Sequence, residues 1–264
     1  MDLGLAGRVA IVTGGSQGIG RAIALELAAE GADLVLVARR REGLDSVAAE
    51  VAALGRQAEV VPADVAVPGS AAPIVDAAME RFGHVDIVVN NAGKGGPRPL
   101  LDTSEDEWMA SIQLNLMSAV RLSTACAPHM VERGWGRLIH IASRVGREPD
   151  PYFAAYAAAK AALINFSKSL ANAFSEHGVL SNCIVPGLIH SEAVDEAAAR
   201  SAAATGKTIE EVFAATLRKR PIPAGRLGEP SDVAGLVAYL ASDRAAWTTG
   251  ACFTVDGGIV RGDR

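Results

Sequence analysis

Cysteine, basic clusters and long hydrophobic runs are scarce in this 264-residue chain, and each scarcity argues against a class of protein. The three cysteines, Cys126, Cys183 and Cys252, are widely spaced and follow no metal-ligand pattern. We therefore expect no metal site, and we interpret the cysteines as reduced core residues of a cytoplasmic protein. The formal net charge is −5 without any basic block, which argues against a nucleic-acid partner. No apolar run approaches the roughly 20 residues of a membrane span, so no membrane partner is expected.

The chain has the composition of a globular domain, with 50% hydrophobic and 21% charged residues. No linker, low-complexity segment or repeat divides it, so residues 1–264 are interpreted as one domain. Short runs rich in Val, Ile and Leu alternate with longer helical segments, which predicts an α/β fold with a doubly wound, seven-stranded parallel sheet. The expected strands are 8–13, 33–38, 58–62, 85–89, 137–142, 180–185 and 251–255. The expected helices are 18–30, 41–54, 69–82, 105–131, 155–177 and 231–241.

A glycine-rich turn, TGGSQGIG at 13–20, joins the first strand to the first helix. Glycines permit a tight turn and let the backbone approach a pyrophosphate at the helix N-terminus. The position directly after the first strand favours dinucleotide binding over an ordinary turn. The spacing differs from G-x-G-x-x-G, because three residues separate Gly14 from Gly18.

The second strand ends in Ala38, where an acidic residue would bind the adenine-ribose hydroxyls of NAD. Arg39 and Arg40 follow, and they either bind a phosphate or belong to a solvated basic loop. If they bind a phosphate, NADP(H) is preferred over NAD(H), because the guanidinium fork suits a 2′-phosphate. NAD(H) remains the alternative.

Other strands also end in polar or small residues, at the edge where open α/β sheets bind ligands. Asp64, which precedes Val65, either binds an adenine amino group or caps the next turn. The run Asn90-Asn91-Ala92-Gly93 either lines a ligand crevice or is plain turn chemistry. Asn115, inside an apolar helical segment, is either a satisfied core amide or a group that holds water.

The stretch from Ser143 to Lys160 carries the chemistry expected of a catalytic site. Tyr156 and Lys160 are four residues apart in an alanine-rich segment, which predicts that they share one face of a helix. A fixed cation beside a phenol is expected to lower the pKa of that phenol. Tyr156 would then exchange a proton with an alcohol or carbonyl oxygen, and Ser143 would supply a second hydrogen bond.

These motifs together resemble the short-chain dehydrogenase/reductase family. The resemblance rests on TGGSQGIG at 13–20, DV at 64–65, NNAG at 90–93, Asn115, Ser143, YAAAK at 156–160, PG at 186–187 and VDGG at 255–258. It implies a Rossmann fold with helices on both sheet faces, a nicotinamide cofactor, and a catalytic tetrad of Asn115, Ser143, Tyr156 and Lys160. In that scheme Tyr156 is the general acid/base, Lys160 lowers its pKa and holds the nicotinamide ribose, and Asn115 keeps a water. The cofactor-binding residues implied are Gly14, Ser16, Gln17, Gly18, Ile19, Gly20, Arg39, Arg40, Asp64, Val65, Asn90, Asn91, Ala92, Gly93, Tyr156, Lys160, Pro186, Gly187, Ile189 and Ser191.

Two positions depart from the family pattern. Ser191 replaces a frequent threonine that touches the nicotinamide carboxamide, and it retains the hydroxyl. Gln17 replaces a basic residue that often precedes the last glycines in NADP-using members, which weakens one marker for NADP.

The expected activity is interconversion of a ketone and a secondary alcohol on a small-molecule substrate, closest to the 3-oxoacyl-carrier-protein reductases through TGGSQGIG and GRLGEPSDVA at 225–234. A dehydrogenase of a sugar, steroid or other secondary alcohol is the alternative. A non-catalytic NAD(P)-binding protein is disfavoured because it would not need the full tetrad, and an epimerase because its chain would be longer.

Two further features are expected outside the sheet. Residues 188–220 interrupt the β-α rhythm and predict a substrate lid of two short helices, the second beginning with a capping box of Thr208 and Glu211. The resemblance implies a homotetramer. The helix around Tyr156 is apolar nearly all round, which independently predicts burial against another subunit.

Overall fold

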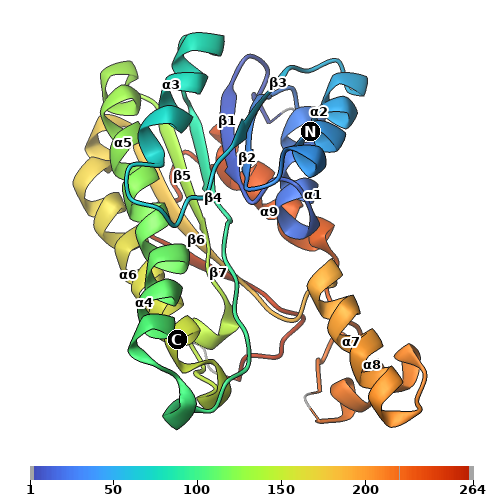
Figure 1. Ribbon diagram of the computed structural model, residues 1–264. Helices are drawn as coiled ribbons and strands as arrows, with labels where there is room; N and C mark the ends of the chain where they lie inside the picture. Colours follow the sequence, from blue (N-terminus) through green and yellow to red (C-terminus); the bar gives the residue numbers. More distant parts are fainter. Residues whose placement is uncertain (1–2, 220, 262–264) are drawn as a thin grey trace.

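A parallel sheet of seven strands forms the centre of the molecule (Figure 1) in the computed structural model, which describes residues 3–219 and 221–261. The strand order is β3-β2-β1-β4-β5-β6-β7, and each adjacent pair is parallel. The strands are β1 (Val9–Thr13), β2 (Asp33–Ala38), β3 (Ala58–Pro62), β4 (Ile87–Asn90), β5 (Gly136–Ile141), β6 (Val179–Pro186) and β7 (Cys252–Val255). The order reverses between β1 and β4, which is the point where doubly wound sheets open a ligand crevice. The predicted fold is confirmed.

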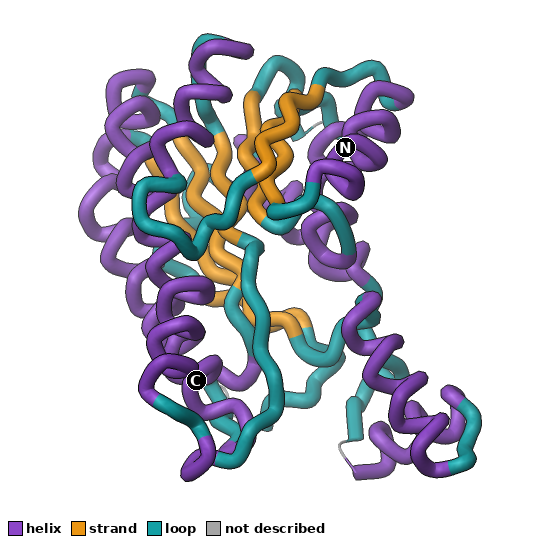
Figure 2. Tube along the Cα trace, viewed as in Figure 1, coloured by secondary structure: helices purple, strands orange, loops and turns teal. Residues whose placement is uncertain are grey.

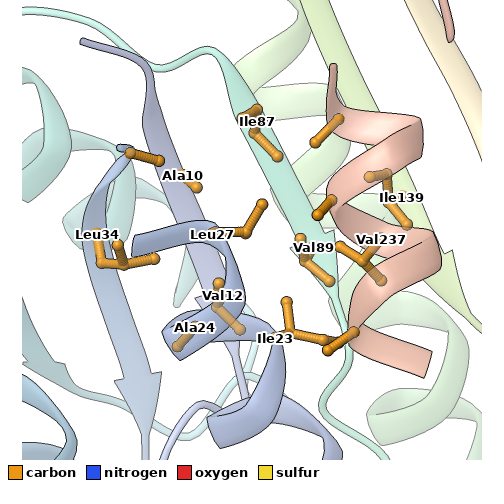
Figure 3. Packing of buried hydrophobic residues seen from close by; sticks show 14 of the residues in the cluster. Ala10, Val12, Ile23, Ala24, Leu27, Leu34, Ile87, Val89, Ile139 and Val237 are labelled. Atoms are coloured by element: carbon orange, nitrogen blue, oxygen red, sulfur yellow. The ribbon is translucent and has the colours of Figure 1, made fainter. Parts of the chain in front are cut away.

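Helices cover both faces of the sheet (Figure 1). Side chains alternate between faces along each strand, so Ala10 and Val12 join one buried cluster while Val9 and Ile11 join the other. Figure 3 shows the first cluster, in which Ile23 and Leu27 of α1 and Val237 of α9 pack on the strands. The helices of this face are α1 (Gly18–Ala29), α2 (Arg41–Ala53) and α9 (Pro230–Ala241). The opposite face carries α3 (Ala71–Phe82), α5 (Ser118–Arg133) and α6 (Ala154–Phe174).

The segment expected to form one helix over 105–131 is interrupted. It consists of α4 (Glu105–Ile112), a π-helical turn (Gln113–Met117) and α5. The π-turn contains Asn115, and the amide of this side chain bonds to backbone groups outside the helix. Helix propensity does not distinguish such a turn from a continuous α-helix.

The loops after β4 and β6 extend beyond the sheet toward α4 and α7 (Figure 2). The second of these leads into α7 (Glu192–Thr205) and α8 (Ile209–Lys219), which pack on each other and project from the body of the molecule (Figure 1). The predicted capping box is present, since Thr208 Oγ1 accepts from Glu211 N at 3.2 Å and Glu211 Oε2 accepts from Thr208 N at 2.9 Å. Arg220, the last residue of the expected lid, lies outside the described residues.

Candidate active site

The glycine turn after β1 is compact because two of its glycines leave room for neighbouring backbone and side-chain atoms. A Cβ on Gly20 would lie 2.1 Å from the carbonyl oxygen of Gly14, and one on Gly14 would lie 2.8 Å from Asn91 Nδ2. Gly14 also has φ +67°, which only glycine adopts readily. Asn91 Nδ2 donates to Thr13 O at 2.9 Å, so the end of β4 holds the turn in place.

The N-terminus of α1 can receive an anion. Its N-cap residue, Gln17, makes no side-chain capping bond, and its first turn has no acidic residue. Free N–H groups at a helix N-terminus carry partial positive charge and suit a pyrophosphate. The glycine cradle and the uncapped helix therefore fit the diphosphate of a nicotinamide dinucleotide, whose binding residues at this turn would include Ser16, Gly18 and Ile19.

The two arginines after β2 are available for a ligand. Arg39 and Arg40 are exposed, and within residues 3–219 and 221–261 neither side chain has an ion pair or hydrogen bond. Arg41 differs, because it pairs with Asp45 at 3.6 Å. Ala38 ends β2 without a carboxylate, so a bound phosphate would meet no repulsion from this position.

Asp64 and Asn90 both have hydrogen-bond partners within the protein. Asp64 Oδ1 accepts from Ala66 N at 3.0 Å, so this carboxylate caps the turn after β3, and its other oxygen is free of that bond. Val65 next to it is buried in the core. Asn90 is buried and donates to Ser123 Oγ at 2.9 Å, under α5. The side chain of Asn90 therefore lies in the core, and its role in cofactor binding stays a prediction.

Tyr156 and Lys160 lie on one side of α6, as the four-residue spacing predicts, with Lys160 Nζ 5.7 Å from the centre of the Tyr156 ring. Ser143 lowers the pKa of the Tyr156 hydroxyl, which shows that the two hydroxyl groups interact. Ser143 follows β5 and caps a 3₁₀ turn, with its Oγ accepting from Val145 N at 3.4 Å. Lys160 Nζ is buried and donates to Ile141 O at 2.7 Å. The sheet edge therefore brings a phenol, a hydroxyl and an ammonium together.

The electrostatics of the pair differ from the expectation. Burial raises the pKa of Tyr156, and the hydrogen bond from Ser143 only partly opposes this. The predicted lowering of the tyrosine pKa by Lys160 is wrong for this structure. Burial also lowers the pKa of Lys160 to about 8, because the ammonium loses its hydration. At neutral pH the site thus holds a protonated phenol and a lysine that is still charged.

Asn115 is tied to the loop after β4. Its Oδ1 accepts from Lys94 N at 3.0 Å, and its Nδ2 donates to Lys94 O at 3.1 Å. A Cβ on Gly93 would lie 2.8 Å from Asn115 Oδ1 and 3.0 Å from Lys160 Nζ, so both side chains converge on this glycine. The amide is satisfied by protein atoms, which is one of the two roles that the sequence left open. Ala92 N is also fixed, since it donates to Thr13 Oγ1 at 3.0 Å.

The end of β6 leads from the sheet toward α7. Gly187, after Pro186, donates its N–H to Val255 O at 2.9 Å, and a Cβ on it would lie 2.7 Å from the Asp256 Cα. Ile189 is buried and bridges to Gly228. Ser191 Oγ accepts from Val194 N at 3.3 Å as the N-cap of α7, which leaves its hydroxyl proton able to donate to a ligand.

Three contributors to the site were not identified from the sequence. Thr13 Oγ1 links β1 to β4 by accepting from Asn91 N at 3.0 Å, and its place at the start of TGGSQGIG was the available signal. Gly95 lies on the face of Tyr156, because a Cβ there would be 2.9 Å from the ring. Glu192 contacts the glycine turn from α7, and no local pattern could have shown this.

Metal and membrane features can be assessed for the part of the chain that the structure describes. No group of three or more His, Cys, Asp or Glu residues there could hold a metal ion. No described helix is long and apolar enough to cross a membrane. Of the three thiols, Cys126 and Cys183 are buried and Cys252 is half-buried, and all are free. Burial raises the pKa of Cys126 to about 12, which makes this thiol inert.

Comparison with known proteins agrees with this geometry. Residues 8–202 match the short chain dehydrogenase family. A 3-oxoacyl-[acyl-carrier-protein] reductase of Escherichia coli is 38% identical over 253 residues, covering 96% of this chain and 97% of the relative.

The crystal structure of L-sorbose reductase from Gluconobacter frateurii, complexed with NADPH and L-sorbose, superposes with a TM-score of 0.96 at 35% identity, over 99% of this chain and 100% of that one. A putative NAD(P) dependent gluconate 5-dehydrogenase from Beutenbergia cavernae with bound NADP has a TM-score of 0.86 at 36% identity, over 98% and 99% of the two chains. The chain therefore belongs to the short-chain dehydrogenase family, as its motifs predicted, and is an NAD(P)-dependent oxidoreductase.

Proposed function

We propose that the protein reduces a ketone on a small polar or acyl substrate to a secondary alcohol, with Tyr156 as the proton donor. The observation that carries this proposal is the placement of Tyr156 and Lys160 on one side of α6, with Lys160 Nζ 5.7 Å from the Tyr156 ring and bonded to Ile141 O at the end of β5, where Ser143 follows. The Tyr156 phenol is protonated at neutral pH, so it can donate its proton to a carbonyl oxygen.

Four residues of the site have distinct roles in this proposed reaction. Tyr156 donates its proton to the substrate oxygen, and the Ser143 hydroxyl orients that oxygen by a second hydrogen bond. Lys160, whose ammonium bonds to Ile141 O at 2.7 Å, has further N–H donors for the nicotinamide ribose. Asn115 fixes the loop at Lys94 and so sets the floor of the site. A bound nicotinamide supplies the hydride.

Two substrate classes follow from specific observations. The similarity to 3-oxoacyl-[acyl-carrier-protein] reductases favours an acyl thioester. The similarity to L-sorbose reductase favours a ketose.

The rates at which the purified enzyme reduces a ketose and an acyl thioester distinguish the two substrate classes. We expect NADPH-dependent reduction of at least one of L-sorbose and acetoacetyl-coenzyme A, measured as loss of nicotinamide absorbance. A kcat/KM at least tenfold higher for L-sorbose would assign the enzyme to ketose reduction, and the reverse would assign it to acyl reduction. If neither these nor a panel of other ketones is reduced, and the corresponding alcohols are not oxidised, the proposed reaction is wrong.

For the cofactor, we propose NADP(H) with NAD(H) as the alternative. Support comes from the unpaired Arg39 and Arg40 at the end of β2 and from the missing carboxylate at Ala38. The two solved relatives described above were crystallised with NADPH and with NADP.

We further propose that residues 188–220 act as a substrate lid on the single domain of residues 1–264. α7 and α8 project from the body and follow directly on Gly187 and Ile189 (Figure 1). Such segments exclude water and select substrate when they close. Free thiols at all three cysteines support our proposal that the protein works in the reducing cytoplasm.

A homotetramer is the assembly that we propose. Ala158 and Ala161 of α6 are exposed in the single chain, so the apolar face of this helix is only partly covered by its own sheet. We expect light scattering at micromolar concentration to give about four times the 27.2 kDa chain mass. A monomeric mass under those conditions would contradict the proposal.

A further inference from the structure

The lid carries a carboxylate into the glycine turn. Glu192 is the first residue of α7, and its Oε1 accepts a hydrogen bond from the backbone N–H of Gly18 at 3.3 Å. A Cβ on Gly18 would lie 3.4 Å from Glu192 Oε2 and 3.8 Å from the Ser191 Cβ. The start of α7 therefore lies directly over the start of α1, although the two residues are 174 positions apart in sequence.

This carboxylate supplies what α1 lacks locally. The helix has no acidic residue in its first turn and no side-chain bond from Gln17, so its N-terminal N–H groups have no anion from their own segment. A carboxylate near such a terminus is stabilised by the helix dipole. Glu192 takes this place from the lid, and it contacts the N–H group that a dinucleotide's pyrophosphate would use.

The lid has few other ties to the dinucleotide-binding half. α7 and α8 pack on each other, while their base is fixed by the hydrogen bond from His190 N to Gly228 O at 2.8 Å. Within residues 3–219 and 221–261, the Glu192–Gly18 bond is the only hydrogen bond between α7 and α1. Its loss would free the start of the lid without disturbing the sheet.

One backbone N–H has a single hydrogen to donate, and two anions held within a few ångströms repel each other. We propose that Glu192 is an internal competitor for the pyrophosphate: it holds the lid on the glycine turn, and a dinucleotide must displace it to bind. The inference rests on the proposed dinucleotide function. It makes the position of α7 depend on whether the turn is filled, and it places a cofactor-affinity determinant in the lid.

The test is direct binding without substrate. Glu192→Gln removes the charge and keeps a carbonyl oxygen of similar shape. We expect the Kd for NADPH, measured by nicotinamide fluorescence, to fall about three- to tenfold, a modest effect because the side chain is exposed. The Kd for inorganic pyrophosphate, measured by calorimetry, should also fall in this variant. Added salt should reduce the difference between variant and parent for both ligands. Glu196→Gln is the matched control: it removes the same charge one turn further along α7, where Glu196 pairs with Arg200 at 3.6 Å, and it should leave both affinities unchanged.

A second readout follows the lid itself. In the ligand-free protein, amide hydrogen exchange over residues 192–205 should be faster than in β1 and β4, and faster still in Glu192→Gln but not in Glu196→Gln. Equal exchange of this segment in parent and Glu192→Gln would overturn the holding role. An NADPH affinity in Glu192→Gln that equals or falls below the parent's would overturn the competition. If the parent bound neither NADPH nor NADH, the proposed function itself would fail, and the pyrophosphate titration would still decide whether Glu192 competes.

Discussion

Replacement of Tyr156 by phenylalanine is expected to lower kcat by about 10²- to 10⁴-fold, the usual contribution of a general acid/base group. The ring keeps its contact with the loop at Gly95, so the fold and the cofactor site remain. Only the proton and the hydrogen bond with Ser143 are lost. Steady-state kinetics measure the first effect, and an NADPH fluorescence titration of the variant measures the second.

Tyr152→Phe is the matched control for this substitution. Tyr152 lies four residues earlier, just before α6, and its side chain is 56% exposed. The same oxygen atom is removed there without touching the Ser143–Lys160 cluster, so kcat should stay within about twofold. Turnover of Tyr156→Phe within about threefold of the parent would remove Tyr156 from the mechanism.

The second large effect is expected on cofactor choice. A charge-assisted hydrogen bond contributes roughly 1.5–3 kcal/mol, so one contact from Arg39 to a 2′-phosphate gives on the order of a 10- to 150-fold preference for NADPH. Arg39→Ala should lose most of that preference through a higher KM for NADPH, while kinetics with NADH change little. The measurement is kcat/KM for both cofactors at fixed substrate concentration.

Two neighbouring arginines sharpen this experiment. Arg40→Ala should lose a smaller part of the selectivity, because this residue adds charge from one position further along. Arg41→Ala should leave it unchanged, since Arg41 lies within α2 and is paired with Asp45. Equal kcat/KM for NADPH and NADH in the parent would show instead that the arginines form a solvated loop.

The sheet and most helices were predictable because each depends on local pattern. Continuous Val, Ile and Leu runs mark strands buried on both faces, as in β1 and β4, whose residues are all buried. Strand boundaries moved by only one or two residues, for example Ile87–Asn90 in place of 85–89. The strand-end positions of Ser143 and Gly187 followed from the same pattern.

Features that depend on tertiary contacts could not be predicted from the sequence. The π-turn contains Asn115, whose amide bonds to Lys94, 21 residues away, and no local pattern predicts either the turn or this contact. Asn90 ends β4 and Asn91 follows it, and only the fold shows that Asn90 bonds to Ser123 while Asn91 holds the glycine turn. The direction of the Tyr156 pKa shift depends on burial, which the Y-x-x-x-K spacing does not reveal.

The hydrogen bond from Asn91 to Thr13 has a consequence for how the protein folds. The bond joins residues 78 positions apart, and the β1–β4 pairing closes the same long loop. Long-range pairing forms slowly, because the entropy of the intervening chain is lost before any contact compensates. A nascent chain synthesised only as far as β3 contains the whole TGGSQGIG sequence, but it lacks Asn91, whose side chain holds this turn in place. A bound dinucleotide can therefore stabilise the protein only after β4 has joined the sheet. It opposes unfolding of the complete fold but does not accelerate the early folding steps.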